Sequence, residues 1–298
     1  MVSGKAANVA RLLGCLLLTG ILLVAAARVA RANEDTDRRS GGVVRLDDGR
    51  LVAPELARII RRGELVAAVI GLPAPPFVDE KGGRLVGYDI ELASAIAATL
   101  RVGVRFDRSA MTYNQVTEMV AQGRADIGLS KLARTLARAQ MVRFSHTYLH
   151  IPHALLFNRV ALAKISGDRP VPAMVRNFSG TLGVIQQSAF EDFAVTNFPA
   201  AKLVRFRNWD AAVEAVKRGT VAAIYRDEVE VRGVLQEDAG LALTLRSVTF
   251  TDLESALAIA VNMRDGPLLA YINEFLDSMP NKPTVASILE RNRKEAGR

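Results

Sequence analysis

The sequence contains little of the chemistry that marks thiol enzymes, metalloproteins and disulfide-rich folds. Its 298 residues include one cysteine, Cys15, and three histidines, His146, His150 and His153. It has no phosphate-binding loop, no glycine-rich dinucleotide turn and no Gly-x-Ser-x-Gly nucleophile elbow. If Cys15 is removed with a signal peptide, thiol catalysis, disulfides and cysteine-ligated metals are excluded. We expect the three histidines to be solvated or to lie at a hinge, because the residues around them predict extended or turn structure rather than a metal-binding helix.

Long apolar runs are also scarce. One spans residues 12–27 near the N-terminus, and the lack of others argues against a polytopic membrane protein. Lys5 and Arg11 precede the run, and Ala30-Arg31-Ala32 follows it with small residues at the two positions a signal peptidase recognises. This layout predicts a secretory signal peptide over 1–32 and a periplasmic protein. The run is short for a bilayer span, which needs about 20 residues. The alternatives are an uncleaved anchor and lipidation at Cys15.

Part of the positive charge of the chain belongs to this N-terminal segment. The formal net charge is +8, and the segment contains Lys5, Arg11, Arg28 and Arg31 without an acid, so cleavage would leave +4. The composition therefore gives little support to nucleic-acid binding. Half of the residues are hydrophobic and 23% are charged. That balance excludes a disordered or collagen-like chain and supplies a packed core.

After a polar segment at 33–50, expected to be a flexible leader, short apolar runs alternate with segments of helical periodicity. The expected strands are 65–70, 102–106, 127–129, 182–185, 203–206, 221–225 and 255–262. The expected helices are 54–63, 89–100, 115–121, 189–195, 209–217 and 267–279. This alternation predicts an α/β fold with right-handed crossovers. The pattern restarts after 153–159, which indicates two similar βαβ lobes.

Several segments carry motifs whose order and spacing are specific when taken together. They are 59–65, 75–77, 82–92, 123–127, Thr135-Leu136-Ala137-Arg138 with Phe144-Ser145 after it, 180–191 and 219–227. Together they resemble the family of bacterial extracytoplasmic solute-binding proteins that serve amino-acid ABC transporters, over roughly 51–289. The resemblance implies a type II-like periplasmic-binding-protein fold, with two lobes joined by a two-stranded hinge. Lobe one would comprise 51–154 and 256–298, lobe two 155–255, and the crossovers would lie near 153–159 and 255–261.

The resemblance also implies roles for individual residues. Arg138 would clamp the ligand α-carboxylate, because a guanidinium fork matches a planar carboxylate bidentately. Ser188 would contact the same carboxylate, and Asp227 would receive the ligand ammonium, since buried charges need partners. Phe77 and Tyr113 would flank the ligand side chain; simple core packing is the alternative for both.

Three positions depart from the family's pattern. Ala133 stands where a small hydroxyl residue usually helps to bind the ammonium, two positions before Thr135. Lys131 stands where a glycine is usual, and Gln187 replaces the usual glycine before Ser188.

These departures change the expected ligand. Ammonium recognition would rest on Asp227 and the backbone, whereas Lys131 and Arg134 would add positive charge near the cleft mouth, which favours anions. The alternative is that both basic side chains point to solvent. The sequence therefore predicts an acidic amino acid or a carboxylate without an amino group as ligand.

The main functional prediction is a periplasmic binding protein without catalysis, cofactor or metal. It would capture an amino acid or related small carboxylate by lobe closure and present it to an ABC-transporter permease. We expect a monomer that binds no nucleic acid and meets the membrane through its permease.

Two alternatives remain open. One is an enzyme resembling the periplasmic cyclohexadienyl dehydratases, which share the fold and need a general acid of raised pKa in the cleft. Glu191, Glu228 and Glu230 are the candidates, although on a strand Glu228 and Glu230 would share one face and Asp227 the other. The second alternative is a sensory or assembly protein that kept the fold.

Overall fold

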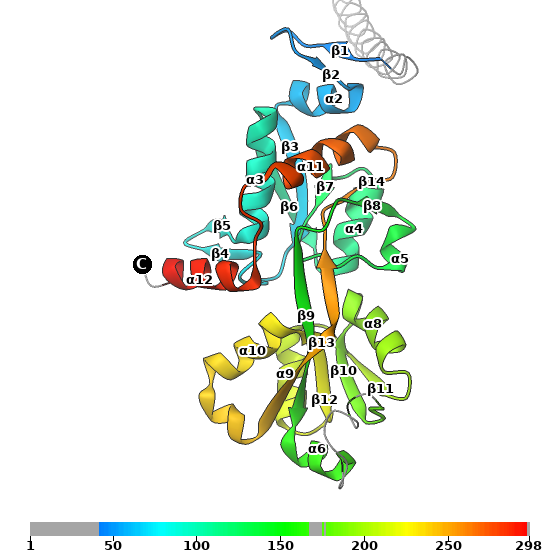
Figure 1. Ribbon diagram of the computed structural model, residues 1–298, viewed down its shortest axis with the longest axis vertical. Helices are drawn as coiled ribbons and strands as arrows, with labels where there is room; N and C mark the ends of the chain where they lie inside the picture. The colour runs from blue at the N-terminus through cyan, green and yellow to red at the C-terminus, as the bar shows by residue number, and fades with distance from the viewer. Residues whose placement is uncertain (1–41, 167–174, 176, 297–298) are drawn as a thin grey trace, which may run out of the picture. The chain divides into compact units, whose positions relative to one another are not determined.

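The computed structural model describes residues 42–166, 175 and 177–296 (Figure 1). The expected signal peptide at 1–32 lies outside the described residues. The chain divides into two compact units, Met1–Arg61 and Arg62–Arg298. In the part of the chain that the structure describes, no helix is both long enough and apolar enough to cross a membrane.

The described part of the first unit is a small hairpin followed by a helix. Strands β1 (Val44–Arg45) and β2 (Leu51–Val52) pair antiparallel, where the sequence predicts part of a flexible leader. Helix α2 (Pro54–Arg62) begins at Pro54 and ends before Gly63, as the sequence predicts. Proline suits the first turn of a helix, and Gly63 has the positive φ of 78° that follows many helix ends.

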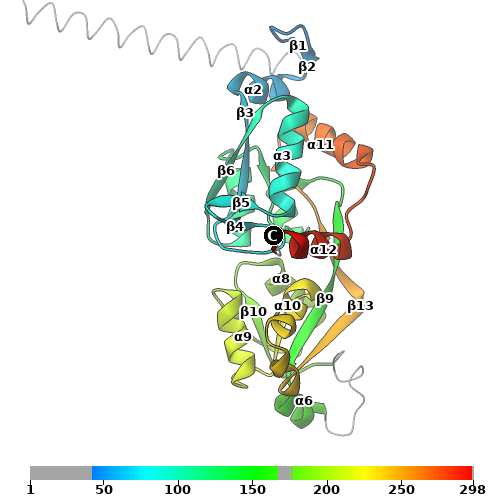
Figure 2. The same cartoon turned by 90° about the vertical axis from the view of Figure 1, so that its left-hand side faces the viewer.

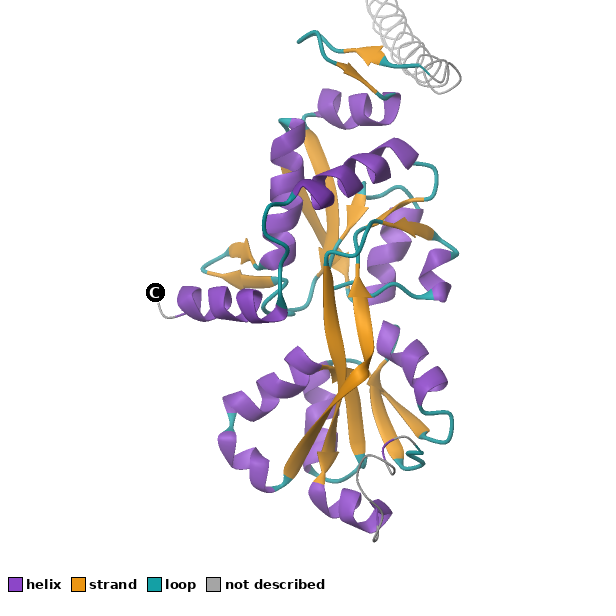
Figure 3. Ribbon diagram, viewed as in Figure 1, coloured by secondary structure: helices purple, strands orange, loops and turns teal. Residues whose placement is uncertain are grey.

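Lobe one is the part of the second unit built on the sheet β6-β3-β7-β14-β8 (Figures 1 and 3). The bounds of these strands are β3 (Glu64–Ile70), β6 (Gly103–Ala110), β7 (Ile127–Gly128), β8 (Val142–Phe144) and β14 (Ala260–Asn262). The other elements are β4 (Asp79–Lys81), β5 (Arg84–Val86), α3 (Tyr88–Leu100), α4 (Tyr113–Ala121), α5 (Leu136–Ala139), α11 (Gly266–Ser278) and α12 (Val285–Ala296). Strand β3 runs parallel to β6 and β7, whereas β14 returns from late in the chain and pairs antiparallel with β7 and β8.

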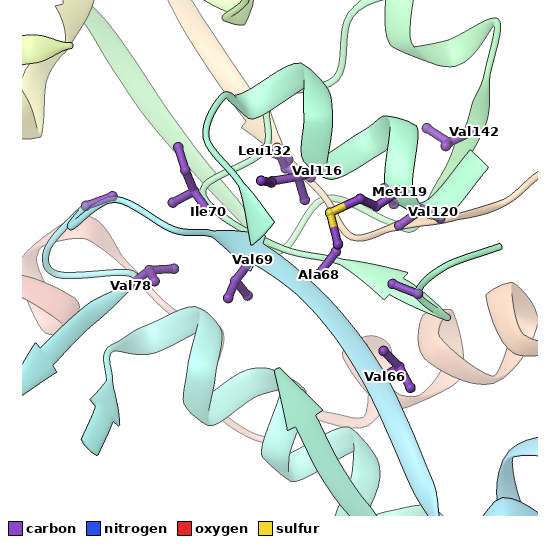
Figure 4. Close-up of a cluster of buried hydrophobic side chains, with 14 of the residues drawn as sticks. Val66, Ala68, Val69, Ile70, Val78, Val116, Met119, Val120, Leu132 and Val142 are labelled. Carbon is purple, nitrogen blue, oxygen red and sulfur yellow. The ribbon is translucent and has the colours of Figure 1, made fainter. Parts of the chain in front are cut away.

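The core of lobe one lies between this sheet and α4 (Figure 4). Val116, Met119 and Val120 of α4 pack with Ala68 and Ile70 of β3, all of them buried. Six of the seven β3 residues are buried. Strand β3 is therefore a continuous apolar run, as expected for a strand covered on both faces.

Lobe two is built on the sheet β11-β10-β12-β9-β13 (Figure 3). The strand bounds are β9 (Leu149–Asn158), β10 (Thr181–Ile185), β11 (Lys202–Phe206), β12 (Ala223–Asp227) and β13 (Leu245–Leu257). The helices are α6 (Arg159–Ser166), α8 (Ala189–Asn197), α9 (Trp209–Lys217), α10 (Glu228–Glu237) and the 3₁₀ helix η1 (Ala239–Leu243). Strand β10 is parallel to β11 and β12, and separate hydrophobic clusters contain residues of α8 and of α9. Both lobes thus have the predicted α/β architecture.

The hinge is formed by β9 and β13, which pair antiparallel along most of their length (Figures 1 and 2). Leu149 pairs with Leu257 at the end nearest lobe one. His153 already pairs with Asp227 inside the sheet of lobe two. The first connection between the lobes therefore lies before His153 and earlier than the predicted 153–159. The second connection, between the end of β13 and the start of β14, falls within the predicted 255–261.

One expected local structure is wrong at a position that matters for the site. Glu228 and Glu230 do not lie on a strand; Glu228 begins helix α10, and Asp227 is its N-cap. The Asp227 carboxylate accepts a hydrogen bond from the Glu230 backbone N–H at 3.2 Å. Such caps satisfy the free N–H groups of a first helical turn, so the chain changes from strand to helix at Asp227.

Candidate functional site

A small cavity of about 20 Å³ lies between the lobes beside the hinge. Six of the eight predicted site residues line it: Tyr113, Lys131, Ala133, Arg138, Ser188 and Asp227. Six residues that the sequence did not single out complete its lining: Ile151, Ala189, Phe190, Arg226, Ser255 and Leu257. Phe77 and Thr135 are not part of this lining, but each contacts a residue that is: Phe77 lies against Lys131, and Thr135 accepts the Arg138 backbone N–H. A volume of this size is close to that of one water molecule, so a larger ligand enters only when the lobes open.

Arg138 is almost completely buried in lobe one, with 2% of its surface exposed. Thr135 is the N-cap of α5, and its hydroxyl oxygen accepts the Arg138 backbone N–H at 3.2 Å. The guanidinium donates through Nε and Nη2 to Asn114 Oδ1, at 3.1 and 3.0 Å, and through Nη1 to the Ala133 carbonyl at 2.8 Å. These contacts fix the plane of the guanidinium and use three of its five N–H groups. Thr135 therefore positions Arg138 and does not line the cavity.

The charge of Arg138 is not matched by a nearby acid. No carboxylate among the described residues lies within 4.0 Å of its guanidinium. Burial lowers the pKa of Arg138 to about 10, and Asp192 offsets this only in part from a greater distance. A buried cation with free N–H donors is the arrangement that a bound carboxylate would complete.

Lys131 is not at the cleft mouth, nor does it point to solvent: 4% of its side chain is exposed. Its ammonium lies 2.9 Å from Asp227 Oδ2 and 2.6 Å from Glu230 Oε1. The Phe77 ring lies beneath it, with the centroid 5.5 Å from Nζ. Burial disfavours both charges, but Lys131 and Arg226 outweigh it and hold the pKa of Asp227 below its usual range. The acid predicted to receive a ligand ammonium is thus paired with an ammonium of the protein. Arg134, in contrast, is exposed.

Arg226 of lobe two is the main residue that the sequence analysis missed. Its Nη2 donates to the Tyr113 hydroxyl at 2.7 Å, and the guanidinium carbon lies 4.9 Å from the centroid of the Tyr113 ring. Its Nε is buried without a hydrogen-bond partner and lies 3.7 Å from Asp227 Oδ2. Tyr113 was expected to flank a ligand side chain, but in this structure it flanks Arg226. The sequence offered one indication of this role, because Arg226 directly precedes the predicted site residue Asp227.

Two residues that stand where the family usually has glycine, Lys131 and Gln187, keep the backbone conformation that suits glycine. Lys131 has φ 51° and Gln187 has φ 53°, both in the left-handed region. Asp89, which is fully buried, holds the first of these turns: its carboxylate accepts from the Lys131 backbone N–H at 2.5 Å and from the Tyr148 hydroxyl at 2.8 Å. The Gln187 carbonyl accepts from the Asn114 backbone N–H at 3.2 Å, a direct contact between the lobes.

A chain of hydrogen bonds runs through lobe two to the cavity. Asn197 Nδ2 donates to the Tyr225 hydroxyl at 3.0 Å, the hydroxyl contacts His153 Nδ1, and His153 Nε2 lies 2.9 Å from Ser255 Oγ. Burial lowers the pKa of His153 to about 4, so the ring is neutral at pH 7. A neutral ring that accepts at Nδ1 donates at Nε2. In the tautomer in which Nδ1 accepts from Tyr225, Nε2 donates to Ser255, and the Ser255 proton is left for a group in the cavity. Ser188, in contrast, donates its hydroxyl to the Ile185 carbonyl at 2.6 Å.

The histidines form no metal site. His146 Nδ1 lies 3.0 Å from Asp277 and His150 Nδ1 lies 2.7 Å from Glu254, both on the exposed surface. His153 is buried, so the expectation of solvation is not met for it. It lies on strand β9 just past the connection between the lobes, where β9 pairs with β12 in lobe two. Over the residues that the structure describes, no group of three His, Cys, Asp or Glu side chains could hold a metal ion.

The candidate general acids are engaged elsewhere. Glu228 pairs with Arg232, and Glu191 contacts Arg205 Nε at 2.5 Å and the Gln187 backbone N–H at 2.8 Å. Neither lines the cavity. Glu230 is paired with Lys131, so none of the three is an available acid at the cavity.

Comparisons with known proteins point to one family. A Maricaulis maris membrane-bound lytic murein transglycosylase F is 31% identical over 104 residues, which are 35% of this chain and 22% of that protein. The match thus spans about a third of this chain and about a fifth of that enzyme's length. An arginine-binding periplasmic protein of Mannheimia haemolytica is 20% identical over 219 residues, 73% of this chain and 86% of that protein.

The fold is also similar to that of solved amino-acid-binding proteins. The crystal structure of an ancestral amino acid-binding protein, a precursor of cyclohexadienyl dehydratase, has a TM-score of 0.63 and 25% identity, and the match covers 79% of this chain and 97% of that one. The profile of the bacterial extracellular solute-binding proteins, family 3, matches residues 66–294. The matched range contains the hinge, most of both lobes and all but the first of the motif-bearing segments, and the chain belongs to the bacterial extracellular solute-binding proteins, family 3.

Proposed function

We propose that the protein is a periplasmic substrate-binding protein that captures a small carboxylate between its lobes for uptake by an ABC transporter. The observation that carries this proposal is Arg138, a buried cation at the cavity with no described carboxylate within 4.0 Å and with unused N–H donors. An uncompensated buried charge is costly, so a bound carboxylate would recover free energy that the empty site lacks.

The cavity also has the donors to couple binding to closure. Arg138 belongs to lobe one, whereas Arg226 belongs to lobe two, and Ser255 lies on a hinge strand. A ligand that contacts both lobes binds the closed form more tightly than the open form and therefore shifts the population toward closure. A permease that distinguishes the two forms would receive loaded protein.

The charges argue against acid catalysis as the main role. A general acid needs a raised pKa, yet the pKa of Asp227, the carboxylate that lines the cavity, is lowered by Lys131 and Arg226 against the effect of burial. None of the acids considered for the dehydratase-like alternative is therefore available at the cavity. This favours a protein that binds its ligand without catalysis.

The test is a ligand panel on protein recovered from the periplasm of a bacterium expressing the full chain. The panel contains lactate, pyruvate, malate, succinate, alanine, aspartate, glutamate, arginine and prephenate, with the melting temperature as readout. A ligand at 100 times its dissociation constant should raise the free energy of unfolding by about 2.7 kcal/mol. A panel without any shift would contradict the proposal, as would turnover of prephenate detected by its loss of absorbance.

A further inference from the structure

We propose that Lys131 supplies, from the protein's own chain, the ammonium that Asp227 would otherwise receive from an amino acid, so that the cavity selects carboxylates without an ammonium group. The inference rests on the proposed function and names its substrate class. It predicts that a 2-hydroxy acid is bound and that the amino acid with the same skeleton is rejected.

The first argument is the place of the Lys131 ammonium. It lies 2.9 Å from Asp227 Oδ2 and 2.6 Å from Glu230 Oε1, with the Phe77 ring 5.5 Å away. A ligand ammonium at Asp227 would meet these same three groups. Lys131 thus makes the contacts that recognition of an amino acid would require, and it makes them from a backbone that Asp89 holds in place.

The second argument is the charge balance. Three cations, Lys131, Arg138 and Arg226, line the cavity, and two carboxylates, Asp227 and Glu230, pair with two of them. Arg138 has no described carboxylate within 4.0 Å, and Asp192 offsets its charge only in part from farther away. A ligand carboxylate would complete this balance, whereas a zwitterion also brings in an ammonium, and the two nearby acids are already paired with Lys131.

The third argument is what displacement would cost. An incoming ammonium would have to remove Lys131 from both acids, and the displaced ammonium would be left in a site where 4% of its side chain is exposed. Breaking a buried ion pair without a new partner is strongly unfavourable, and two ammonium groups at one acid repel each other. Rejection of amino acids follows from these two effects.

The experiment uses matched ligand pairs that differ in one substituent: lactate and alanine, malate and aspartate, 2-hydroxyglutarate and glutamate. Calorimetry of the full chain gives the ratio of dissociation constants within each pair. We expect at least one hydroxy acid to bind roughly 100-fold more tightly than its amino acid. Lys131→Gly should reverse the preference, because glycine suits φ 51° and frees Asp227 and Glu230 for a ligand ammonium.

The matched control is Arg101→Gly. Arg101 is also a basic residue in the left-handed region, with φ 60°, but it is exposed at the end of α3. The control removes the same charge and the same backbone strain, so its ligand preference should equal that of the wild type. If Lys131→Gly does not fold, as judged by its melting curve, Lys131→Met removes the ammonium and keeps the length of the side chain.

The outcomes separate the two proposals. Wild-type protein that binds the members of a pair within about threefold, or prefers the amino acid, overturns the inference and leaves the proposed function standing. Folded position-131 variants that keep the wild-type preference overturn it as well. Failure of both the wild type and the Lys131 variants to bind any member contradicts the proposed function itself.

Discussion

Arg138→Met should abolish carboxylate binding and leave the protein folded. The substitution replaces a buried guanidinium by an uncharged side chain of similar length. Two effects on the ligand-free protein oppose each other, and both follow from the contacts of Arg138. The prediction therefore depends on their relative size.

The stabilising effect is the removal of a buried charge. Burial lowers the pKa of Arg138 by more than two units from its ordinary value, to about 10. At 1.36 kcal/mol per unit, the ionised guanidinium destabilises the folded state by about 3 kcal/mol at neutral pH. The sign is unfavourable because the folded pKa of this cation is depressed below its unfolded value. Methionine removes this contribution.

The destabilising effect is the loss of hydrogen bonds. Asn114 Oδ1 and the Ala133 carbonyl lose the guanidinium as donor. A buried acceptor without a partner costs about 1–3 kcal/mol. Two of them cost about 2–6 kcal/mol against a relief of roughly 3 kcal/mol, so we expect the free energy of unfolding to rise by at most about 1 kcal/mol or to fall by at most about 3 kcal/mol.

Ligand binding has no such compensation. Loss of the charged partner of a buried carboxylate costs about 2–5 kcal/mol, which weakens binding roughly 30- to several-thousand-fold. Calorimetry with the best ligand of the panel measures this loss, and urea denaturation measures stability. Arg143→Met, which removes an exposed arginine of β8, is the control and should bind like the wild type. A folded Arg138→Met protein with affinity within threefold of the wild type would refute the site assignment, and a loss of more than about 4 kcal/mol of stability would give Arg138 a structural role instead.

Three further predictions follow from the site. Ser255→Ala should weaken carboxylate binding about 5- to 10-fold in calorimetry, because a Ser255 hydroxyl that accepts from His153 Nε2 keeps its own proton to donate to the ligand. Unchanged affinity would contradict this direction of the hydrogen bond. Because the pKa of His153 is about 4 when folded and 6.5 when unfolded, its contribution to the free energy of unfolding should fall by roughly 3 kcal/mol as the pH decreases from 6.5 through 4, whereas Asp89, whose pKa is raised to about 6 by burial, contributes with the opposite sign. His153→Gln lacks this titration, so an equal pH slope in both proteins would contradict the assignment. Gln187→Gly should raise the free energy of unfolding by about 0.5–1 kcal/mol in urea, because φ is 53° there, without changing ligand affinity.

The sheets could be predicted because their central strands are covered on both faces. Strands β3 and β10 are short apolar runs, and their counterparts at 65–70 and 182–185 were expected from hydrophobicity alone. Strand β13 was expected only at its end, because exposed polar residues interrupt its buried positions. Its regularity comes from pairing with β9, which is a tertiary interaction.

The start of α10 had a local signal that the alternation of Glu and Val obscured. Asp227-Glu228-Val229-Glu230 has an acid at the N-cap and a glutamate three residues later, as in a capping box. The alternation of Glu and Val after Asp227 favoured a continued strand, but β12 ends at Asp227 and the alternating residues belong to α10. Reading the cap first would have placed Glu230 beside Asp227 on one turn.

The carboxylate half of the site could be predicted, and the ammonium half could not. Thr135 and Arg138 belong to one short motif, so their contact with each other is local, and the proposed role of Arg138 came from the family resemblance. Lys131 and Glu230 are 99 positions apart and meet because the lobes meet. No periodicity or spacing encodes that contact. The charge of Lys131 predicted a preference for anions, but its burial and its partners required the structure.

The two replaced glycines show which substitution carries a function. Lys131 and Gln187 have nearly the same φ, 51° and 53°, so each pays a comparable backbone strain. Gln187 is exposed, and its contacts to Asn114 and Glu191 use main-chain atoms, which glycine would supply equally well. The Lys131 side chain instead forms two buried ion pairs that glycine cannot replace. The backbone strain at Lys131 therefore accompanies two specific ion pairs, which indicates that the side chain is needed for those contacts. The proposed specificity of this cavity therefore rests on Lys131, which lies outside the motif of Thr135 and Arg138, at a position where the backbone alone would favour glycine.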